Sequence, residues 1–164
     1  MTLFKSLYGN AESCVRVNGT DSTFFTINSG VRQGCVAAPD LFNCVLDYLM
    51  SKVCEQVPGV QFGSRTLADL EYADDTAMLA SSFGDIRRAL IVFSQEAKKL
   101  GLVVNWAKTE LIFIGDGPIP PLIYIDDEAL YFVPTFVYLG SLLSHLGSLL
   151  PEINRRRGIA AGVM

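Results

Sequence analysis

The sequence lacks a long apolar run, a secretory leader and a cysteine pair of the metal-binding kind. No uninterrupted apolar stretch approaches the roughly 18 residues that a membrane-spanning helix needs, and the opening MTLFKSLYGN contains no apolar core followed by small residues. We therefore expect no membrane partner and an intracellular protein, with nucleus or cytoplasm left open. Cys14, Cys35, Cys44 and Cys54 form no CxxC pair, so we expect small, mostly buried thiols.

Positive charge is also scarce, because 13 Lys and Arg face 17 Asp and Glu, which gives a net charge of −4. Such a chain is not expected to bind nucleic acid through a broad basic field, although a local site remains open. Basic residues gather at 87–88, 98–99 and 155–157, where solvated helix faces are the simpler interpretation. Apolar residues are abundant, at 50% of 164. This length and composition predict one domain with a sizeable core, or a surface meant for absent neighbours.

An Asn-Gly pair near the start of the chain predicts a β-hairpin. Val15 and Val17 alternate with polar residues before Asn18-Gly19, and Phe25 and Ile27 resume the alternation. Later apolar runs predict a strand pair around the carboxylates at 74–75 and strands in the segments LVVNW, ELIFIG, LIYID, LYFVP and FVYLGSLLS.

Helical spacing of apolar residues predicts helices between these strands. The first contains Pro39 near its start and is expected to end near Pro58-Gly59. A short basic helix is expected from Pro151. For the middle helix, Gly101 is the expected end, the cap candidates are Ser81, Ser82 and Asp85, and the expected apolar face is Ile86, Leu90, Phe93, Ala97 and Leu100. The alternation of hairpins and helices predicts an α+β domain, a mostly antiparallel sheet with helices packed on one face.

Two pairs of adjacent aspartates stand in expected turns. Asp126-Asp127 is interpreted as an ordinary hairpin turn, whereas Asp74-Asp75 separates two apolar strands. Two carboxylates about 4 Å apart repel by roughly 4 kcal/mol at an effective dielectric near 20, so either water or a cation must compensate. Rigid carboxylates suit Mg²⁺, and two such ions can clamp both oxygens of a phosphoryl displacement. A receiver-type phosphoacceptor domain also pairs aspartates, but the expected hairpins differ from its parallel alternation of strands and helices.

Four ordered blocks make the chain resemble reverse transcriptases, and it looks most like those of non-LTR (LINE-type) retrotransposons. The blocks are NSGVRQGCVAAPDLFNCVLDYLM, LEYADDTAMLASS, GLVVNWAKTE and FVYLGSLLS, and they extend from about Ser29 to Ser144. The resemblance implies the palm of a right-hand polymerase, which extends a DNA primer on an RNA template. It also implies deoxynucleotide triphosphates as substrates and Mg²⁺, or Mn²⁺ in its place, as the cofactor.

The same resemblance implies roles for individual residues. Asp74 would be the principal metal ligand and Asp75 its neighbour, while Lys108 would offer charge or a proton to the leaving pyrophosphate or, alternatively, end a strand in solvent. The residues implied at the nucleotide or template are Gly30, Arg32, Gln33, Gly34, Tyr72 and Ala73, where a glycine leaves room for close backbone approach. The residues implied at the primer end are Tyr138, Leu139 and Gly140, and for Leu139 we favour a place in the hairpin core.

The chain also departs from the family pattern. The block with the family's first metal-binding aspartate, which resembles AFD, is absent, and Asp21, Asp40, Asp47 and Asp69 stand in other contexts. By the same resemblance, we expect residues 1–164 to contain neither the fingers nor a full thumb. We therefore expect residues 1–164 to form a partial reverse transcriptase domain that is inactive by itself and that needs the missing upstream polymerase segment. The alternative is an inert palm remnant that acts as a protein-interaction scaffold.

Overall fold

The computed structural model describes residues 2–32, 34–118, 122–125 and 127–163. The chain folds into two compact units, of which the first comprises Met1–Tyr48 and Leu70–Ala77 and the second comprises Leu49–Asp69 and Met78–Met164. In the described ranges, no helix has both the length and the apolar character to cross a membrane.

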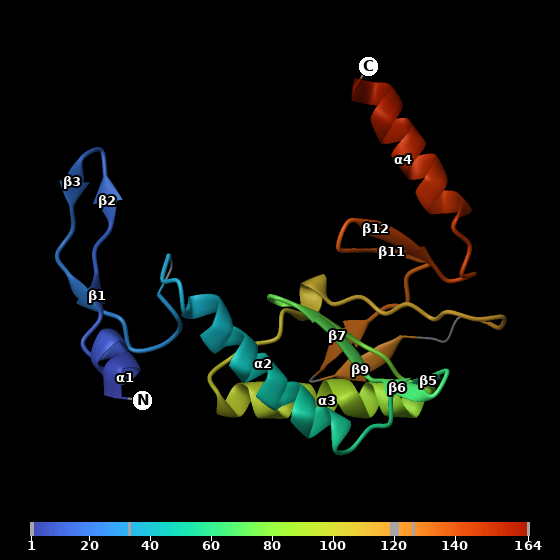
Figure 1. Cartoon of the computed structure of the whole chain (residues 1–164), viewed down its shortest axis with the longest axis horizontal. Coiled ribbons are helices and arrows are strands. Elements are labelled where there is room, and N and C mark those ends of the chain that lie inside the picture. The colour runs from blue at the N-terminus through green and yellow to red at the C-terminus, as the bar shows by residue number, and fades with distance from the viewer. Residues whose placement is uncertain (1, 33, 119–121, 126, 164) are drawn as a thin grey trace. The chain divides into compact units, whose positions relative to one another are not determined.

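The first unit is built from one short helix, short strands and the beginning of a long helix (Figure 1). Its elements are α1 (Thr2–Tyr8), β1 (Glu12–Ser13), β2 (Arg16–Val17), β3 (Thr20–Asp21), β4 (Phe25–Thr26), the first part of α2 (Ala38–Cys54), and most of β7 (Asp69–Tyr72) and β8 (Asp75–Met78).

The predicted Asn-Gly hairpin is confirmed. β2 pairs antiparallel with β3, and β1 pairs antiparallel with β4 farther from the turn. Asn18 and Gly19 have φ angles of 51° and 81°, the left-handed conformations that a tight two-residue hairpin turn requires. Across the strands, Arg16 Nε donates to Asp21 Oδ1 at 2.6 Å. This ion pair lowers the pKa of Asp21 and raises the pKa of Arg16.

Many apolar side chains of the first unit remain exposed. They include Val15, Val17, Phe24, Phe25, Ile27, Val31 and Val36. The alternating residues therefore form the predicted strands, but their apolar side chains are not buried in a continuous core. Most of the buried apolar residues lie in the second unit, which also exposes apolar side chains such as Phe62 and Val103.

The second unit contains most of the buried core. Its elements are the end of α2, β5 (Val60–Phe62), β6 (Arg65–Leu67), α3 (Phe83–Lys99), the 3₁₀ turn η1 (Trp106–Lys108), β9 (Ile123–Ile125), β10 (Glu128–Leu130), β11 (Thr135–Tyr138), β12 (Ser141–Ser144) and α4 (Leu150–Val163). On α3, Ala89 and Val92 pack with Met50, Val53 and Val57 in one cluster, and Leu90 packs with Leu111, Ile123, Ile125 and Leu130 in another. Helix α3 is thus the element that joins the α2 end to the β9–β10 hairpin (Figure 1).

The predicted limits of α3 are confirmed. Ser82 is the N-cap, since its hydroxyl accepts a hydrogen bond from the Asp85 N–H at 3.1 Å and donates to the Asp85 carboxylate at 2.7 Å. Gly101 follows the helix with a φ of 75°, and its N–H donates to a carbonyl of the last turn. Leu90 is buried as predicted, but the prediction was wrong for Leu100, which is the C-cap residue and 46% exposed.

The strands of the described residues pair in twos and do not form one continuous sheet. The mixed helix and strand composition is confirmed, with five of the pairs antiparallel by register. Three strand predictions were wrong: Trp106 begins a 3₁₀ turn, the segment ELIFIG contributes only a parallel bridge between Leu111 and Phe132, and only Leu130 of the segment LYFVP lies in a strand, at the end of β10. Trp106 packs against the cluster around Leu90 and Leu111 belongs to it, so these two side chains are packed without a strand ladder.

The cysteines are more exposed than predicted. Cys14 and Cys35 are half-buried, Cys44 and Cys54 are exposed, and all four are free thiols. The buried positions of α2 are taken by larger apolar side chains at helical spacing, namely Leu46, Leu49, Met50 and Val53. Helix α2 ends at Cys54, a few residues before the predicted Pro58-Gly59.

Candidate active site

The adjacent carboxylates lie at the turn between β7 and β8. The two strands pair with each other, and Ala73 and Asp74 form the connection between them. Ala73 has a φ of 54°, a left-handed conformation that costs an alanine roughly 1–2 kcal/mol. Backbone strain of this kind is concentrated at active sites and ligand clamps, so the turn is a candidate active site.

Both carboxylates face solvent. Tyr72, Ala73, Asp74 and Asp75 are all exposed, and Tyr72 retains 64% of its accessible surface. Within the part of the chain that the structure describes, no hydrogen bond or ion pair engages either aspartate side chain. Water therefore solvates the pair, and the carboxylate oxygens remain available to an incoming cation.

The turn of the β9–β10 hairpin provides an internal comparison. Glu128 lies opposite Ile125 across this hairpin, and Asp127 has a φ of 67°. The hairpin predicted around Asp126-Asp127 is thus present, although Asp126 itself lies outside the described residues. Asp127 is exposed and adopts the left-handed conformation that aspartate tolerates better than alanine.

The Asp74-Asp75 pair fits part of a Mg²⁺ site. Among the described residues, no group of three or more His, Cys, Asp or Glu side chains is arranged to hold a metal ion. Mg²⁺ characteristically keeps several waters and uses one or two protein carboxylates together with substrate phosphates. Asp74 and Asp75 match that requirement for one ion, and a further shared carboxylate would have to complete a two-ion site.

The glycine-containing block before α2 belongs to the same unit as this turn. Gly30 and Gly34 have φ angles of 86° and 80°, and no protein atom lies within 4 Å of the position that a Cβ would take at either residue. In the protein itself, glycine is therefore required by backbone conformation and not by crowding. Arg32 is exposed and donates from Nη1 to the Leu7 carbonyl at 3.3 Å. The predicted Gln33 lies outside the described residues.

Lys108 belongs to the second unit and is the last residue of η1. It is exposed, and the expected alternative of a strand end was wrong because the backbone forms a 3₁₀ turn here. A shallow hollow of about 270 Å³ lies beside this turn, lined by Trp106, Ala107, Thr109, Glu110, Ala129, Tyr131 and Val133. Neither Lys108 nor the aspartate pair lines it.

The predicted primer-end residues form the turn of the β11–β12 hairpin. Tyr138 lies opposite Ser141, and the two residues between them are left-handed, with φ angles of 47° at Leu139 and 79° at Gly140. The prediction that Leu139 lies in the hairpin core was wrong, since its side chain is 52% exposed. A residue at the first turn position projects away from both strands, which explains this exposure.

Sequence analysis missed the contacts between this turn and α4. Glu152 Oε2 accepts from the Leu142 backbone N–H at 3.0 Å, and Arg155 Nη2 donates to the Gly140 carbonyl at 2.5 Å. Arg155 and then Arg156 lower the pKa of Glu152 to about 2. The available signal was the spacing of Glu152 from Arg155 and Arg156, three and four residues on, which places the three side chains on one helix face.

The predicted site residues are thus distributed over both units. The first unit contains Gly30, Arg32, Gly34, Tyr72, Ala73, Asp74 and Asp75, and the second contains Lys108, Tyr138, Leu139 and Gly140. Each group is defined within its own unit: a strained carboxylate turn and two left-handed glycines in one, a clamped hairpin turn in the other.

Comparisons with known proteins agree with the motifs. A family model described as "Reverse transcriptase (RNA-dependent DNA polymerase)" matches residues 1–143. The chain is 28% identical over 154 residues to the Retrovirus-related Pol polyprotein from type-1 retrotransposable element R2 of Popillia japonica, covering 88% of this chain and 25% of that protein. It is 29% identical over 96 residues to the corresponding R2 polyprotein of Nasonia vitripennis, covering 58% of this chain and 9% of that protein.

A third relative comes from a vertebrate. The Transposon TX1 uncharacterized 149 kDa protein of Xenopus laevis is 24% identical over 113 residues, covering 68% of this chain and 9% of that protein. The chain thus spans a quarter or less of the length of these relatives. Since the family model covers all four sequence blocks except the last residue of the fourth, the chain belongs to the reverse transcriptase family, in the branch of the non-LTR retrotransposons.

Proposed function

We propose that this chain is palm sequence of an RNA-directed DNA polymerase and that the Asp74-Asp75 turn serves nucleotidyl transfer. One observation carries the proposal: within a chain of this family, two exposed carboxylates stand on a strained turn and have no protein partner in the described ranges. Carboxylates left free of arginine and lysine are available to a metal ion. An RNA template, a DNA primer and deoxynucleotide triphosphates would be the partners.

Asp74 would be the principal ligand of Mg²⁺, or of Mn²⁺ in its place, with Asp75 as the neighbouring ligand. When bound, the ion neutralises phosphate charge and orients the reacting oxygens. Because no third acidic ligand accompanies the pair among the described residues, we expect this chain to need a carboxylate from another segment or partner for efficient catalysis.

The remaining residues would act on the nucleic acid and the leaving group. Tyr72 and Ala73 would border the nucleotide, Lys108 would stabilise the leaving pyrophosphate with its exposed ammonium group, and Leu139 would contact the primer end. The further residues proposed at template or nucleotide are Gly30, Arg32, Gln33 and Gly34, and those at the primer are Tyr138 and Gly140.

The first experiment measures Mn²⁺ binding in the presence of a deoxynucleotide triphosphate, by water-proton relaxation, for the wild type and Asp74→Asn. The substitution removes one ligand charge, and we expect the affinity for the ion to fall at least about tenfold. Asp127→Asn is the matched control, because it removes the same charge from an exposed, left-handed residue of another hairpin turn. Primer extension on an RNA template, with the same three proteins, is the second readout.

Equal Mn²⁺ affinities for Asp74→Asn and Asp127→Asn would contradict the proposed metal site. The exposed apolar side chains of the first unit, such as Phe24 and Val36, favour a second candidate, a scaffold that binds another polypeptide. If Asp74→Asn leaves both Mn²⁺ binding and association with a polymerase segment unchanged, the scaffold is supported in place of the polymerase.

A further inference from the structure

Helix α4 is attached to the β11–β12 turn without a buried apolar side chain. No residue of α4 is buried, so the hydrophobic effect contributes little to its orientation. By contrast, α3 inserts Ala89, Leu90 and Val92 into two apolar clusters. Polar contacts must therefore mainly determine the position of α4 on the hairpin. Most of these contacts involve the carboxylate of Glu152.

Glu152 is the centre of these contacts. Its side chain is 12% exposed, and each of its two carboxylate oxygens accepts two hydrogen bonds. Oε2 accepts from the Leu142 N–H at 3.0 Å and from Arg155 Nε at 2.8 Å, while Oε1 accepts from Arg156 Nε at 2.5 Å and from Arg155 Nη2 at 3.2 Å. An ionised carboxylate has about four acceptor sites, and all of them are used here.

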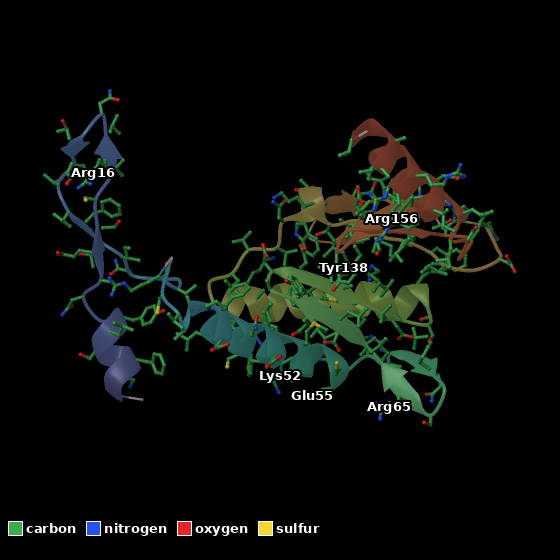
Figure 2. The ribbon with its side chains drawn as sticks, turned by 45° about the horizontal axis from the view of Figure 1, so that its top comes forward. Arg16, Lys52, Glu55, Arg65, Tyr138 and Arg156 are labelled. Atoms are coloured by element: carbon green, nitrogen blue, oxygen red, sulfur yellow. The ribbon has the colours of Figure 1, made fainter. Side chains whose placement is uncertain are left out.

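Both arginines also reach the turn itself. Arg155 Nη2 donates to the Gly140 carbonyl at 2.5 Å, and Arg156 Nη2 donates to the Ser141 hydroxyl at 3.4 Å. Figure 2 shows Arg156 on α4 and Tyr138 on β11 in the same part of the second unit. We call Glu152, Arg155 and Arg156 the clasp. It connects the first turns of α4 to the left-handed Gly140 and to the first two residues of β12, Ser141 and Leu142.

The clasp matches what a positioned turn requires. Leu139 and Gly140 are both left-handed and Leu139 projects into solvent, so the two strands alone leave the turn open to movement. Charge-assisted hydrogen bonds to the Gly140 carbonyl and the Leu142 N–H restrict that movement. With two guanidinium groups and one carboxylate, the clasp carries a net charge of +1 beside the turn, a sign that favours contact with phosphate.

We infer that Glu152 and Arg155 are positioning residues that hold the Leu139-Gly140 turn and α4 in register for the recessed 3′ end of a DNA strand paired with its template. This inference rests on the proposed function, and it adds residues that act through the turn without touching the reacting atoms. Positioning of this kind affects how strongly the protein prefers a recessed 3′ end over a blunt end, because a small displacement of the binding turn weakens its contacts with the strand.

The test compares binding of two fluorescent RNA–DNA duplexes of equal length, one with a recessed DNA 3′ end and one blunt, by anisotropy at low salt. We expect the wild type to prefer the recessed duplex and Glu152→Gln to lose about tenfold of that preference, as when a charged hydrogen-bond partner is removed. Glu152→Gln changes the net charge from −4 to −3, so general electrostatics alone would strengthen binding. The charge change should strengthen binding to both duplexes and leave the preference unaltered, whereas the inference predicts that the preference itself is lost.

Two pairs of matched variants complete the test. Arg155→Lys keeps the charge but loses the planar fork that contacts both Glu152 and Gly140, and it is compared with Arg157→Lys on the exposed part of the same helix. Glu128→Gln, at an exposed strand position, is the control for Glu152→Gln. We expect both controls to keep the wild-type preference for the recessed duplex. Hydrogen exchange at the Leu142 amide should accelerate in Glu152→Gln.

Each result has a definite meaning. Wild-type preference for the recessed end that persists in Glu152→Gln and Arg155→Lys would overturn the inference while leaving the proposed function intact. Absence of any preference in the wild type would overturn the primer role in the proposed function, and the inference with it. If Glu152→Gln loses its helical circular dichroism, Arg155→Lys still decides between the outcomes.

Discussion

The two units of this chain differ in how many apolar residues they bury and in how their hairpin turns are held. The first unit contains the strained carboxylate turn, yet it leaves many apolar side chains exposed. Among the described residues, its buried apolar residues are only Ala11, Ala38 and Leu46. The second unit contains both apolar clusters and a hairpin turn held by hydrogen bonds to Arg155 and Glu152 of α4. The adjacent carboxylates and most of the buried core thus lie in different units.

The difference is clearest at the two hairpin turns. At 73–74 an alanine is left-handed and the neighbouring carboxylates have no protein partner within the described ranges. At 139–140 the turn backbone accepts a hydrogen bond from Arg155, and Glu152 engages the following strand. The carboxylates of the 73–74 turn are thus free of protein partners in the described ranges, whereas side chains of α4 hold the 139–140 turn.

The largest expected effect on stability comes from the core of the second unit. Leu130 is 1% exposed, and Leu130→Ala should lower the free energy of unfolding by about 2–5 kcal/mol through lost burial and the cavity left behind. Phe25→Ala in the first unit, where the ring is 50% exposed, should cost less than about 1 kcal/mol. Urea unfolding followed by circular dichroism measures both, and similar losses would break the contrast between the units.

Acid should weaken the clamped turn selectively. The pKa of Glu152 is lowered from 4.5 to about 2, so its ion pairs contribute stability that is fully present above pH 4.5 and is lost as the pH falls toward 2. We expect the Leu142 amide resonance to titrate in that window, with a smaller effect on unfolding than Leu130→Ala. In Glu152→Gln the resonance should not move, and a titration that persists in this variant would assign the effect to another group.

The smallest effect is expected at the carboxylate turn. Ala73→Gly removes the left-handed strain of Ala73 but adds freedom to the unfolded chain, so a net stabilisation of about 0.5 kcal/mol is expected. Gly84→Ala is the control, because Gly84 has no left-handed φ and lies in the first turn of α3. Thermal unfolding measures the difference, and destabilisation by Ala73→Gly would show that the turn is not strained.

Local patterns predicted much of this structure. The Asn18-Gly19 hairpin and the limits of α3 follow from turn and cap chemistry that involves only neighbouring residues. The strand predicted from Leu102 to Trp106 failed because a strand needs a hydrogen-bonded neighbour, and the neighbour is not specified by the segment itself. The prediction of a core position for Leu139 failed for a related reason, because an apolar side chain does not by itself show whether the residue lies in a strand or in the turn.

The sequence by itself determined the family, the carboxylate pair and the short-range elements, because these depend on residue types at fixed spacings along the chain. Only the tertiary structure decided which apolar residues are buried in the second unit and which remain exposed in the first. It also decided that Glu152 serves the Gly140 turn and not a solvated helix face. Burial and ion pairing join residues distant in sequence, and their energies depend on which groups folding removes from water.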